Sequence, residues 1–383
     1  MTSIREFTNH NKIITPIYID VDSDYFLHLQ QLFKDIRKDL VSKNIDSCYI
    51  DILDEYQSIL ISTLQKYFEG DLLAAQQNVD TLIKEMIAVD DAFAVSKINN
   101  SISFYDADNI ISEKTFQGNK QEFFRARVSN GFTEYKKMEM LHIPFNQRHL
   151  ISTQRFSVPG LPCLYLGTTS YCCWLEVGTP ADDNFNVSPI YIDDNFKILN
   201  LTVNSFVLQL ISNTTENENI LKSTFKLWLL TLASSYKVRQ NARTFKTEYI
   251  IPQLLMLSCK KNGLNGVAYF SKQVKNDRFA YKICVNLALF SEYNGEKKLS
   301  DMCRKIEIAN SFNYAMYKQL LPSLKYKQHQ LNIENTKYIT NIGDYRRQFP
   351  YGETEFYCFD RYLFAHLHTE MGCVDVEQIN QEE

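Results

Sequence analysis

The spacing of apolar residues changes once along this chain, near residue 120. From about residue 20 to 95, apolar side chains recur at helical intervals in three stretches, which begin near Phe26, Ile52 and Leu72. This spacing predicts three amphipathic helices with short connections, as in a small helical bundle. From about residue 121 the apolar residues come instead in short runs typical of strands. The chain is therefore expected to be α+β, with an N-terminal helical bundle (residues 1–115) followed by a mixed-sheet domain (residues 116–383).

Polar, turn-rich sequence at 96–120 places the boundary between these two parts. In the second part, strands are expected over 123–128, 162–166, 189–192, 196–201, 266–270 and 283–290, and helices over 171–177, 221–238 and 251–261. A polar loop is expected over 272–278, and an acidic tail from 375 to the end.

Composition narrows the class of protein. The chain has 383 residues, 45% of them hydrophobic and 22% charged, which is enough for a large core. The net charge of −4 and the lack of a basic block give no reason to expect a nucleic-acid surface. No signal peptide is apparent, and the longest apolar run, 227–233, is too short for a membrane span. Nine scattered cysteines fit reduced thiols, so we expect a cytoplasmic protein without a membrane partner.

Glu176 is the strongest single candidate for chemistry. It is the only charged residue between Arg155 and Asp182, in an apolar stretch with helical spacing. A carboxylate in such a stretch must be exposed, paired or functional, because burying it alone is costly.

Two positions carry candidate arginines. Arg125 and Arg127 are two residues apart on an expected strand and so share one face. A guanidinium fork suits a diphosphate, although a solvated strand face is the more common role. Arg155 stands before a Pro-Gly turn, which brings the backbone close to a ligand or simply reverses the chain.

Tyr165 and Ser271 complete the set of candidates. Tyr165 lies on an apolar strand, where it either stacks on the flat ring of a ligand or joins the core. Ser271 ends one strand and begins a polar loop, which is also an ordinary way to end a strand.

Other chemistries fit less well. His366, His368 and Glu370 resemble a metal cluster, but alternate histidines on a helix point apart, and no cysteine pair has the spacing of a zinc site. The chain also lacks a P-loop, a dinucleotide-binding glycine motif and a nucleophile elbow. We therefore expect no bound metal.

In order and spacing, these residues resemble the RES-domain family, over roughly residues 120 to 300. The resemblance rests on Phe124-Arg125, Arg155-Phe156 with Pro159-Gly160, Leu164-Tyr165-Leu166, Glu176, the run from Gly266 to Ser271, and Asn286. The family usually has Gly before its second Arg and Asn after the aromatic residue, where this chain has Gln154 and Ser157.

The resemblance implies a fold related to the ADP-ribosyltransferases and an enzyme that degrades NAD+ as its substrate, by hydrolysis or phosphorolysis. It implies Arg125, Glu176 and Ser271 as catalytic residues, with Arg155 and Tyr165 also binding NAD+. Many members are toxins held by an antitoxin, and larger members with a helical N-terminal part serve in antiphage defence.

Several alternatives remain open from the sequence. The first active-site arginine is Arg125 or Arg127, and the acceptor is water or phosphate. The runner-up activity is transfer of ADP-ribose to a macromolecule, and a third reading is a non-catalytic nucleotide-binding sensor or scaffold. The sequence defines neither the trigger nor the oligomeric state, although apolar helices in a small bundle leave a homo-oligomer open.

Overall fold

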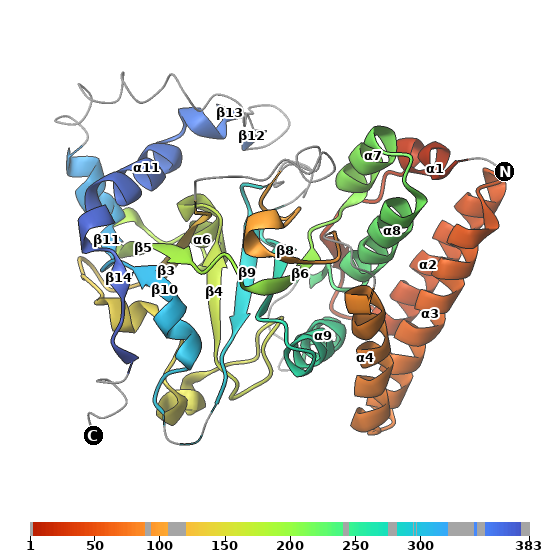
Figure 1. The fold of residues 1–383 in the computed structure, drawn as a ribbon, viewed down its shortest axis with the longest axis horizontal. Coiled ribbons are helices and arrows are strands. Elements are labelled where there is room, and N and C mark those ends of the chain that lie inside the picture. Colours follow the sequence, from red (N-terminus) through yellow and green to blue (C-terminus); the bar gives the residue numbers. More distant parts are fainter. Residues whose placement is uncertain are drawn as a thin grey trace. The chain divides into compact units, whose positions relative to one another are not determined.

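The computed structural model describes residues 3–88, 93–105, 120–239, 245–274, 282–293, 295, 297–320, 341–342 and 349–376. Helices and mixed strands together make the protein α+β, as predicted (Figure 1). The predicted polar loop at 272–278 and the acidic tail lie largely outside the described residues. Within the described ranges, no helix combines the length and the hydropathy needed to cross a membrane.

The chain forms two compact units, each built from three separate stretches. The helical unit comprises Met1–Gln117, Thr153–Pro159 and Asn195–Arg278, and the sheet unit comprises Gly118–Ser152, Gly160–Asp194 and Phe279–Glu383. The units therefore interleave along the sequence, whereas the predicted domains meet at a single point near residue 115. That division into domains stays a prediction.

The three predicted N-terminal helices are confirmed as α2 (Tyr25–Ser42), α3 (Ser47–Phe68) and α4 (Leu72–Ala88), which lie side by side in Figure 1. Asp24 caps α2 by accepting hydrogen bonds from the backbone N–H groups of Phe26 and Leu27. After α3, Gly70 takes a positive φ of 82°, which turns the chain into α4.

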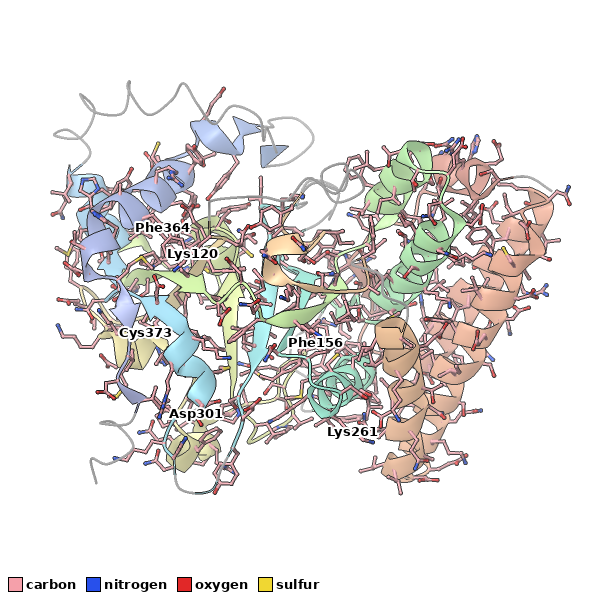
Figure 2. The ribbon with its side chains drawn as sticks, in the orientation of Figure 1. Lys120, Phe156, Lys261, Asp301, Phe364 and Cys373 are labelled. Carbon is pink, nitrogen blue, oxygen red and sulfur yellow. The ribbon has the colours of Figure 1, made fainter. Side chains whose placement is uncertain are left out.

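Later helices of the same unit complete the packing of these three. They are α7 (Ser205–Thr214), α8 (Glu218–Ala233) and α9 (Ile250–Lys261), with α1 (Ile4–His10) against α7. The buried Asp80 of α4 accepts hydrogen bonds from Ser258 and Lys261 of α9; Lys261 is labelled in Figure 2. The N-terminal helices thus share their core with elements made much later in the chain.

The helix predicted over 221–238 is wrong at its end. α8 stops at Ala233, and Tyr236–Val238 form strand β7, which pairs in parallel with β1 (Ile17–Ile19). Tyr236 and Val238 are buried while Lys237 between them is not, which is the alternation of a strand. The helical unit also contains β2 (Val95–Lys97), β6 (Lys197–Leu201) and β8 (Gly266–Phe270), with β6 antiparallel to β2 and parallel to β8.

The sheet unit is built on antiparallel strands. Their order is β14 (Gly372–Cys373), β10 (Ile306–Ile308), β5 (Phe185–Ile192), β3 (Glu122–Val128), β4 (Cys163–Gly167) and β9 (Val285–Phe290), with β11 (Phe312–Asn313) also on β5. A short pair, β12 (Asn341–Ile342) with β13 (Phe349–Pro350), stands apart from this order. The predicted strands at 123–128, 162–166, 189–192 and 283–290 are confirmed, with small shifts at their ends.

One face of these strands carries the core of the sheet unit. Phe124 of β3 packs there with Val187 of β5, Cys173 of α6 (Ser170–Glu176), and Phe364 of α11 (Glu355–Leu367). The rings of Phe124 and Phe364 meet edge to face, with centroids 5.3 Å apart; Phe364 is labelled in Figure 2. Helices α6 and α11 therefore cover the same face of the sheet.

Candidate functional site

Glu176 is the last residue of α6, and its side chain is exposed. Its Oε1 accepts a hydrogen bond of 2.6 Å from Nδ2 of Asn286, a residue of β9 that is only 4% exposed. The sequence required this carboxylate to be exposed, paired or functional, and the structure makes it both exposed and paired.

The other end of the Asn286 amide is also held. Its Oδ1 accepts from the Sγ of Cys172 on α6 at 3.2 Å. Burial raises the pKa of the Cys172 thiol well above its usual value, so the sulfur keeps its proton and acts as the donor. The amide therefore has one orientation, with its N–H group toward Glu176.

Gly167 lets α6 lie close to β4. A Cβ added at Gly167 would stand 2.9 Å from Sγ of Cys173 and 3.2 Å from Cβ of Cys172. The hydroxyls of Thr168 and Thr169, between strand and helix, both donate to the carbonyl of Ile283, at 2.9 and 2.8 Å. The short connection is thus fixed at both strand and helix, and it sets where Glu176 lies.

Tyr165 shares a face of the sheet with Asn286. Gly167 pairs with Asn286 across β4 and β9, and Tyr165 lies two residues before Gly167, so strand alternation places all three on one face. Tyr165 is half-buried. The structure therefore brings Glu176, Asn286 and Tyr165 to the same side of the sheet.

Arg125 lies on the other face. Phe124 pairs with Gly167, so the next residue, Arg125, faces away from Tyr165 and Asn286, although its Nη1 donates to the backbone carbonyl of Tyr165 at 3.1 Å. Among the described residues no carboxylate pairs with Arg125, and its buried Nε has no hydrogen-bond partner. Burial, with the neighbouring charge of Arg127, lowers the pKa of Arg125 to about 9.

Arg127 shares these properties. Its Nε is buried and has no hydrogen-bond partner in the described ranges, and burial lowers its pKa. Its guanidinium lies 5.9 Å from the centre of the Tyr135 ring. The choice between Arg125 and Arg127 as the first active-site arginine stays open.

Arg155 and Ser271 belong to the helical unit. The Arg155 guanidinium is buried and donates to the carbonyls of Ser234 (2.9 Å) and Tyr236 (2.8 Å), which follow α8. It also lies over the Tyr249 ring, 4.7 Å from its centre. Ser271 is fully buried after β8, and its Oγ accepts from the N–H of Gln273. The structure thus divides the predicted residues into two sets, one in each unit.

Asp360 and Tyr351 are site-linked residues that sequence reasoning missed. Asp360 accepts hydrogen bonds from the backbone of Ser170, the first residue of α6, and from the Tyr351 hydroxyl. A signal existed, because Asp360 is a carboxylate inside an aromatic-rich helix, the same kind of anomaly that singled out Glu176.

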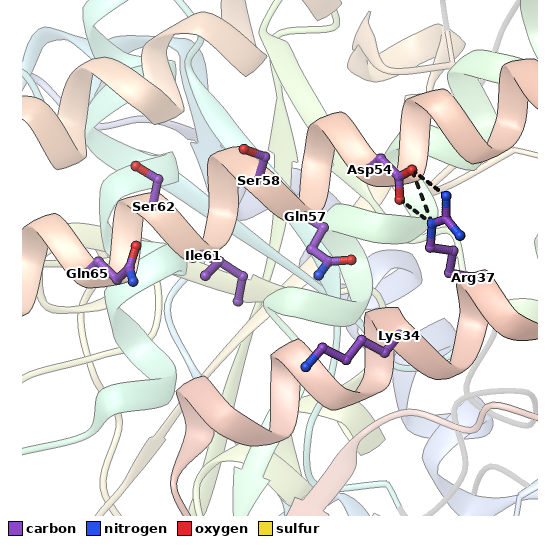
Figure 3. A pocket seen from close by; sticks show the side chains of 8 residues that line it. All are labelled: Lys34, Arg37, Asp54, Gln57, Ser58, Ile61, Ser62 and Gln65. Atoms are coloured by element: carbon purple, nitrogen blue, oxygen red, sulfur yellow. Dashed lines mark hydrogen bonds and ion pairs between the residues drawn. The ribbon is translucent and has the colours of Figure 1, made fainter.

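Two further candidate sites are the histidine cluster considered above and a groove in the helical unit. Within the described ranges, no three His, Cys, Asp or Glu side chains group as metal ligands would, and that includes His366, His368 and Glu370. A groove of about 430 Å³ lies between α2 and α3 (Figure 3). There Arg37 is already held by Asp54, with hydrogen bonds of 2.9 to 3.1 Å. None of the predicted site residues lines this groove.

Comparison with known proteins gives one informative relative. The chain is 30% identical over 262 residues to a Bacillus subtilis (strain 168) protein named "Putative toxin YopC". The match covers 64% of this chain and 55% of YopC, so this chain spans only about half of that relative. No family model matches the chain.

Among solved structures, the chain is similar to one from the Mycobacterium tuberculosis MbcT–MbcA toxin–antitoxin complex. The similarity has a TM-score of 0.29 and 14% identity, and covers 53% of this chain and 89% of that one. We base no conclusion on a similarity of this size.

Proposed function

We propose that this protein is a toxin that degrades NAD+ by breaking the bond between nicotinamide and ribose. The name of its relative, "Putative toxin YopC", supports the proposal that this protein is a toxin. The proposal that it degrades NAD+ is supported mainly by Glu176. Its carboxylate faces solvent, yet its Oε1 is held by a 2.6 Å hydrogen bond from Nδ2 of Asn286. It also agrees with the resemblance to the RES-domain family.

The chemistry needs such a carboxylate. As the bond from C1′ of the ribose to the nicotinamide nitrogen breaks, its electron pair leaves with nicotinamide and positive charge grows on the ribose. A carboxylate already held in place stabilises that charge without reorganising. An oxygen of water or phosphate then bonds to C1′, and water gives up a proton. We assign charge stabilisation to Glu176 and its orientation to Asn286.

The other predicted residues take supporting parts in the proposal. Tyr165, on the face that carries Asn286, would stack on the nicotinamide ring. Arg125 has no carboxylate partner in the described ranges, but it faces away from Tyr165 and Asn286, so its binding of the diphosphate remains a prediction. The hydrogen bond from Nη1 of Arg125 to the Tyr165 carbonyl also stabilises β4. Arg155 and Ser271, the absence of a metal, and an antitoxin or regulatory partner remain predictions.

The test is to incubate the purified protein with NAD+, with and without phosphate, and to measure released nicotinamide. Glu176→Gln should lower the rate by about 100-fold or more, because it removes the charge and keeps the shape. Glu370→Gln is the matched control, since it removes an exposed carboxylate from the same unit and should leave the rate unchanged.

The products distinguish the alternatives. ADP-ribose identifies water as the acceptor, and its phosphorylated form identifies phosphate. Label from ADP-ribose in macromolecules would identify a transferase, and NAD+ binding without nicotinamide release would identify a sensor. Nicotinamide release that survives Glu176→Gln would refute the assignment of Glu176.

A further inference from the structure

Within the part of the chain that the structure describes, Asp360 is a buried carboxyl group that lacks a cationic partner. It lies on the core-facing side of α11 and is 5% exposed. Among the described residues, no lysine, arginine or histidine forms an ion pair with it. Burying a carboxylate is costly unless hydrogen bonds replace its water. The burial of this carboxyl group therefore calls for a structural or functional explanation.

Its two hydrogen bonds connect separate elements. Oδ1 accepts from the backbone N–H of Ser170, the first residue of α6, at 3.0 Å. Oδ2 accepts from the hydroxyl of Tyr351, in the short 3₁₀ helix η7 (Tyr351–Glu353), at 2.6 Å. Asp360 therefore fastens the start of α6 to α11 and to the turn before α11.

Helix α6 transmits this contact to Glu176. It has seven residues, so at about 1.5 Å per residue its two ends lie only about 10 Å apart. Asp360 holds the first residue, and Glu176, the last, meets Asn286. At Gly167, α6 packs directly against β4, so the helix moves there as one rigid unit. A displacement of Ser170 at its first residue therefore also displaces Glu176 at its last.

We propose that Asp360 is a positioning residue, which fixes α6 and with it the Glu176 carboxylate, and which does so most firmly when it is ionised. An ionised carboxylate accepts both hydrogen bonds with full charge, and charge-assisted hydrogen bonds are about twice as strong as neutral ones. Protonation leaves Ser170 with a neutral acceptor and turns the other oxygen into a donor toward Tyr351. Protonation therefore weakens the hydrogen bonds between Asp360 and its two partners, Ser170 and Tyr351, but does not remove them.

The surroundings of Asp360 make this change available near neutral pH. Burial raises its pKa to about 7. The titratable groups that interact electrostatically with it are Tyr351 from η7, Cys173 from α6, Glu122 from β3, Tyr317 from the segment after β11, and Tyr357 and Cys358 from its own helix. Burial raises the pKa of the tyrosines and cysteines in this group, so they stay neutral near pH 7. Glu122 is held by Arg361, with hydrogen bonds of 3.0 and 2.9 Å, and its variant serves as a control.

The primary experiment reads the position of α6 directly and does not need NAD+. The chain has two tryptophans, Trp174 on α6 and Trp228 on α8. Trp174 packs against Tyr171 and Phe356, with ring centres 6.2 and 5.6 Å apart. Fluorine NMR of the full chain labelled with fluorotryptophan gives one signal for each, assigned with Trp174→Phe.

We expect the Trp174 signal to shift in a single step with a midpoint near pH 7. Asp360→Asn, which has the shape and hydrogen bonds of the protonated acid, should show no step and hold the low-pH signal throughout. Glu122→Gln should keep the step. A Trp174 signal that does not move between pH 5.5 and 8.5, or a step that survives Asp360→Asn, overturns the proposal.

The second measurement is enzymatic, and only this one rests on the proposed function. For Asp360→Asn at pH 8 we expect kcat to fall about tenfold to the wild-type value at pH 6, with KM much less affected, because the change misplaces a group that acts in the transition state. The variant should be at least as stable to denaturant as the wild type at pH 8, since it removes a buried charge. If the wild type consumes no NAD+, the proposed function fails, while the Trp174 signal still decides whether Asp360 positions α6.

Discussion

Replacing Gly167 by alanine should strain the contact between β4 and α6. The new Cβ would lie 2.9 Å from Sγ of Cys173 and 3.2 Å from Cβ of Cys172, and the first of these is closer than real Cβ atoms approach. Cys173 cannot swing away freely, because it is buried and its thiol donates to the carbonyl of Phe124 at 3.2 Å. The Cβ of Cys172 moves only if the helix backbone moves.

Overpacking of this kind typically costs about 1 to 3 kcal/mol of unfolding free energy, and we expect Gly167→Ala to fall in that range. Gly352→Ala is the matched control. A Cβ there meets nothing within 4 Å, so its effect should stay below about 0.5 kcal/mol. Removing Sγ with Cys173→Ala should relieve part of the strain, which gives a favourable coupling of about 1 kcal/mol in the double variant.

The assay is guanidinium unfolding of the four variants and the wild type, followed by circular dichroism and by tryptophan emission. The slope with denaturant must be unchanged for the free energies to be compared. The reasoning would be refuted if Gly167→Ala unfolded within about 0.5 kcal/mol of the wild type, or if the coupling with Cys173→Ala were zero.

Three further predictions concern single side chains. Asn286→Leu removes the 2.6 Å hydrogen bond to Glu176, so nicotinamide release should fall at least about tenfold; an unchanged kcat would argue against the assigned role of Asn286. Arg155→Lys cannot serve both the Ser234 and Tyr236 carbonyls while stacking on Tyr249, and should cost about 1 to 3 kcal/mol in denaturant unfolding, whereas Arg239→Lys on the surface should cost nearly nothing. Burial raises the pKa of Asp80, but hydrogen bonds from Lys261, Ser258 and Gln76 outweigh it and bring the pKa below its usual value. This contribution to stability is complete above the unfolded pKa of about 4 and is lost as pH falls below it, so Asp80→Asn should flatten the acid side of a stability profile measured by denaturant midpoints.

The sequence predicts local structure well where one periodic pattern extends over several turns or a whole strand. The helices that begin at Tyr25, Ser47 and Leu72 follow from apolar spacing, and the strands from short apolar runs. The end of α8 could not be predicted in this way. Strand β7 exists because Ile17–Ile19, more than 200 residues earlier, pairs with it. A local pattern carries no information about so distant a partner.

The candidate site shows the same limit. Glu176 could be singled out because a lone charge in an apolar helix is unusual, and the structure shows it exposed and hydrogen-bonded. Its contact with Asn286, the opposite facing of Arg125 and Tyr165, and the hold of Asp360 on Ser170 depend on strand register and on packing between distant segments. These are tertiary properties, which the local pattern of apolar and polar residues does not define.

The interleaving of the two units has a consequence for the newly made chain on the ribosome. The helical unit cannot close until α8 and α9 have emerged, because these helices cover the buried faces of the N-terminal helices. The anchor of α6 comes later still, since Asp360 follows Ser170 by 190 residues. A chain whose synthesis stops before residue 360 would contain Glu176 but not the group that holds its helix. For the toxin proposed above, this order of synthesis would leave unfinished chains without the residue that positions Glu176.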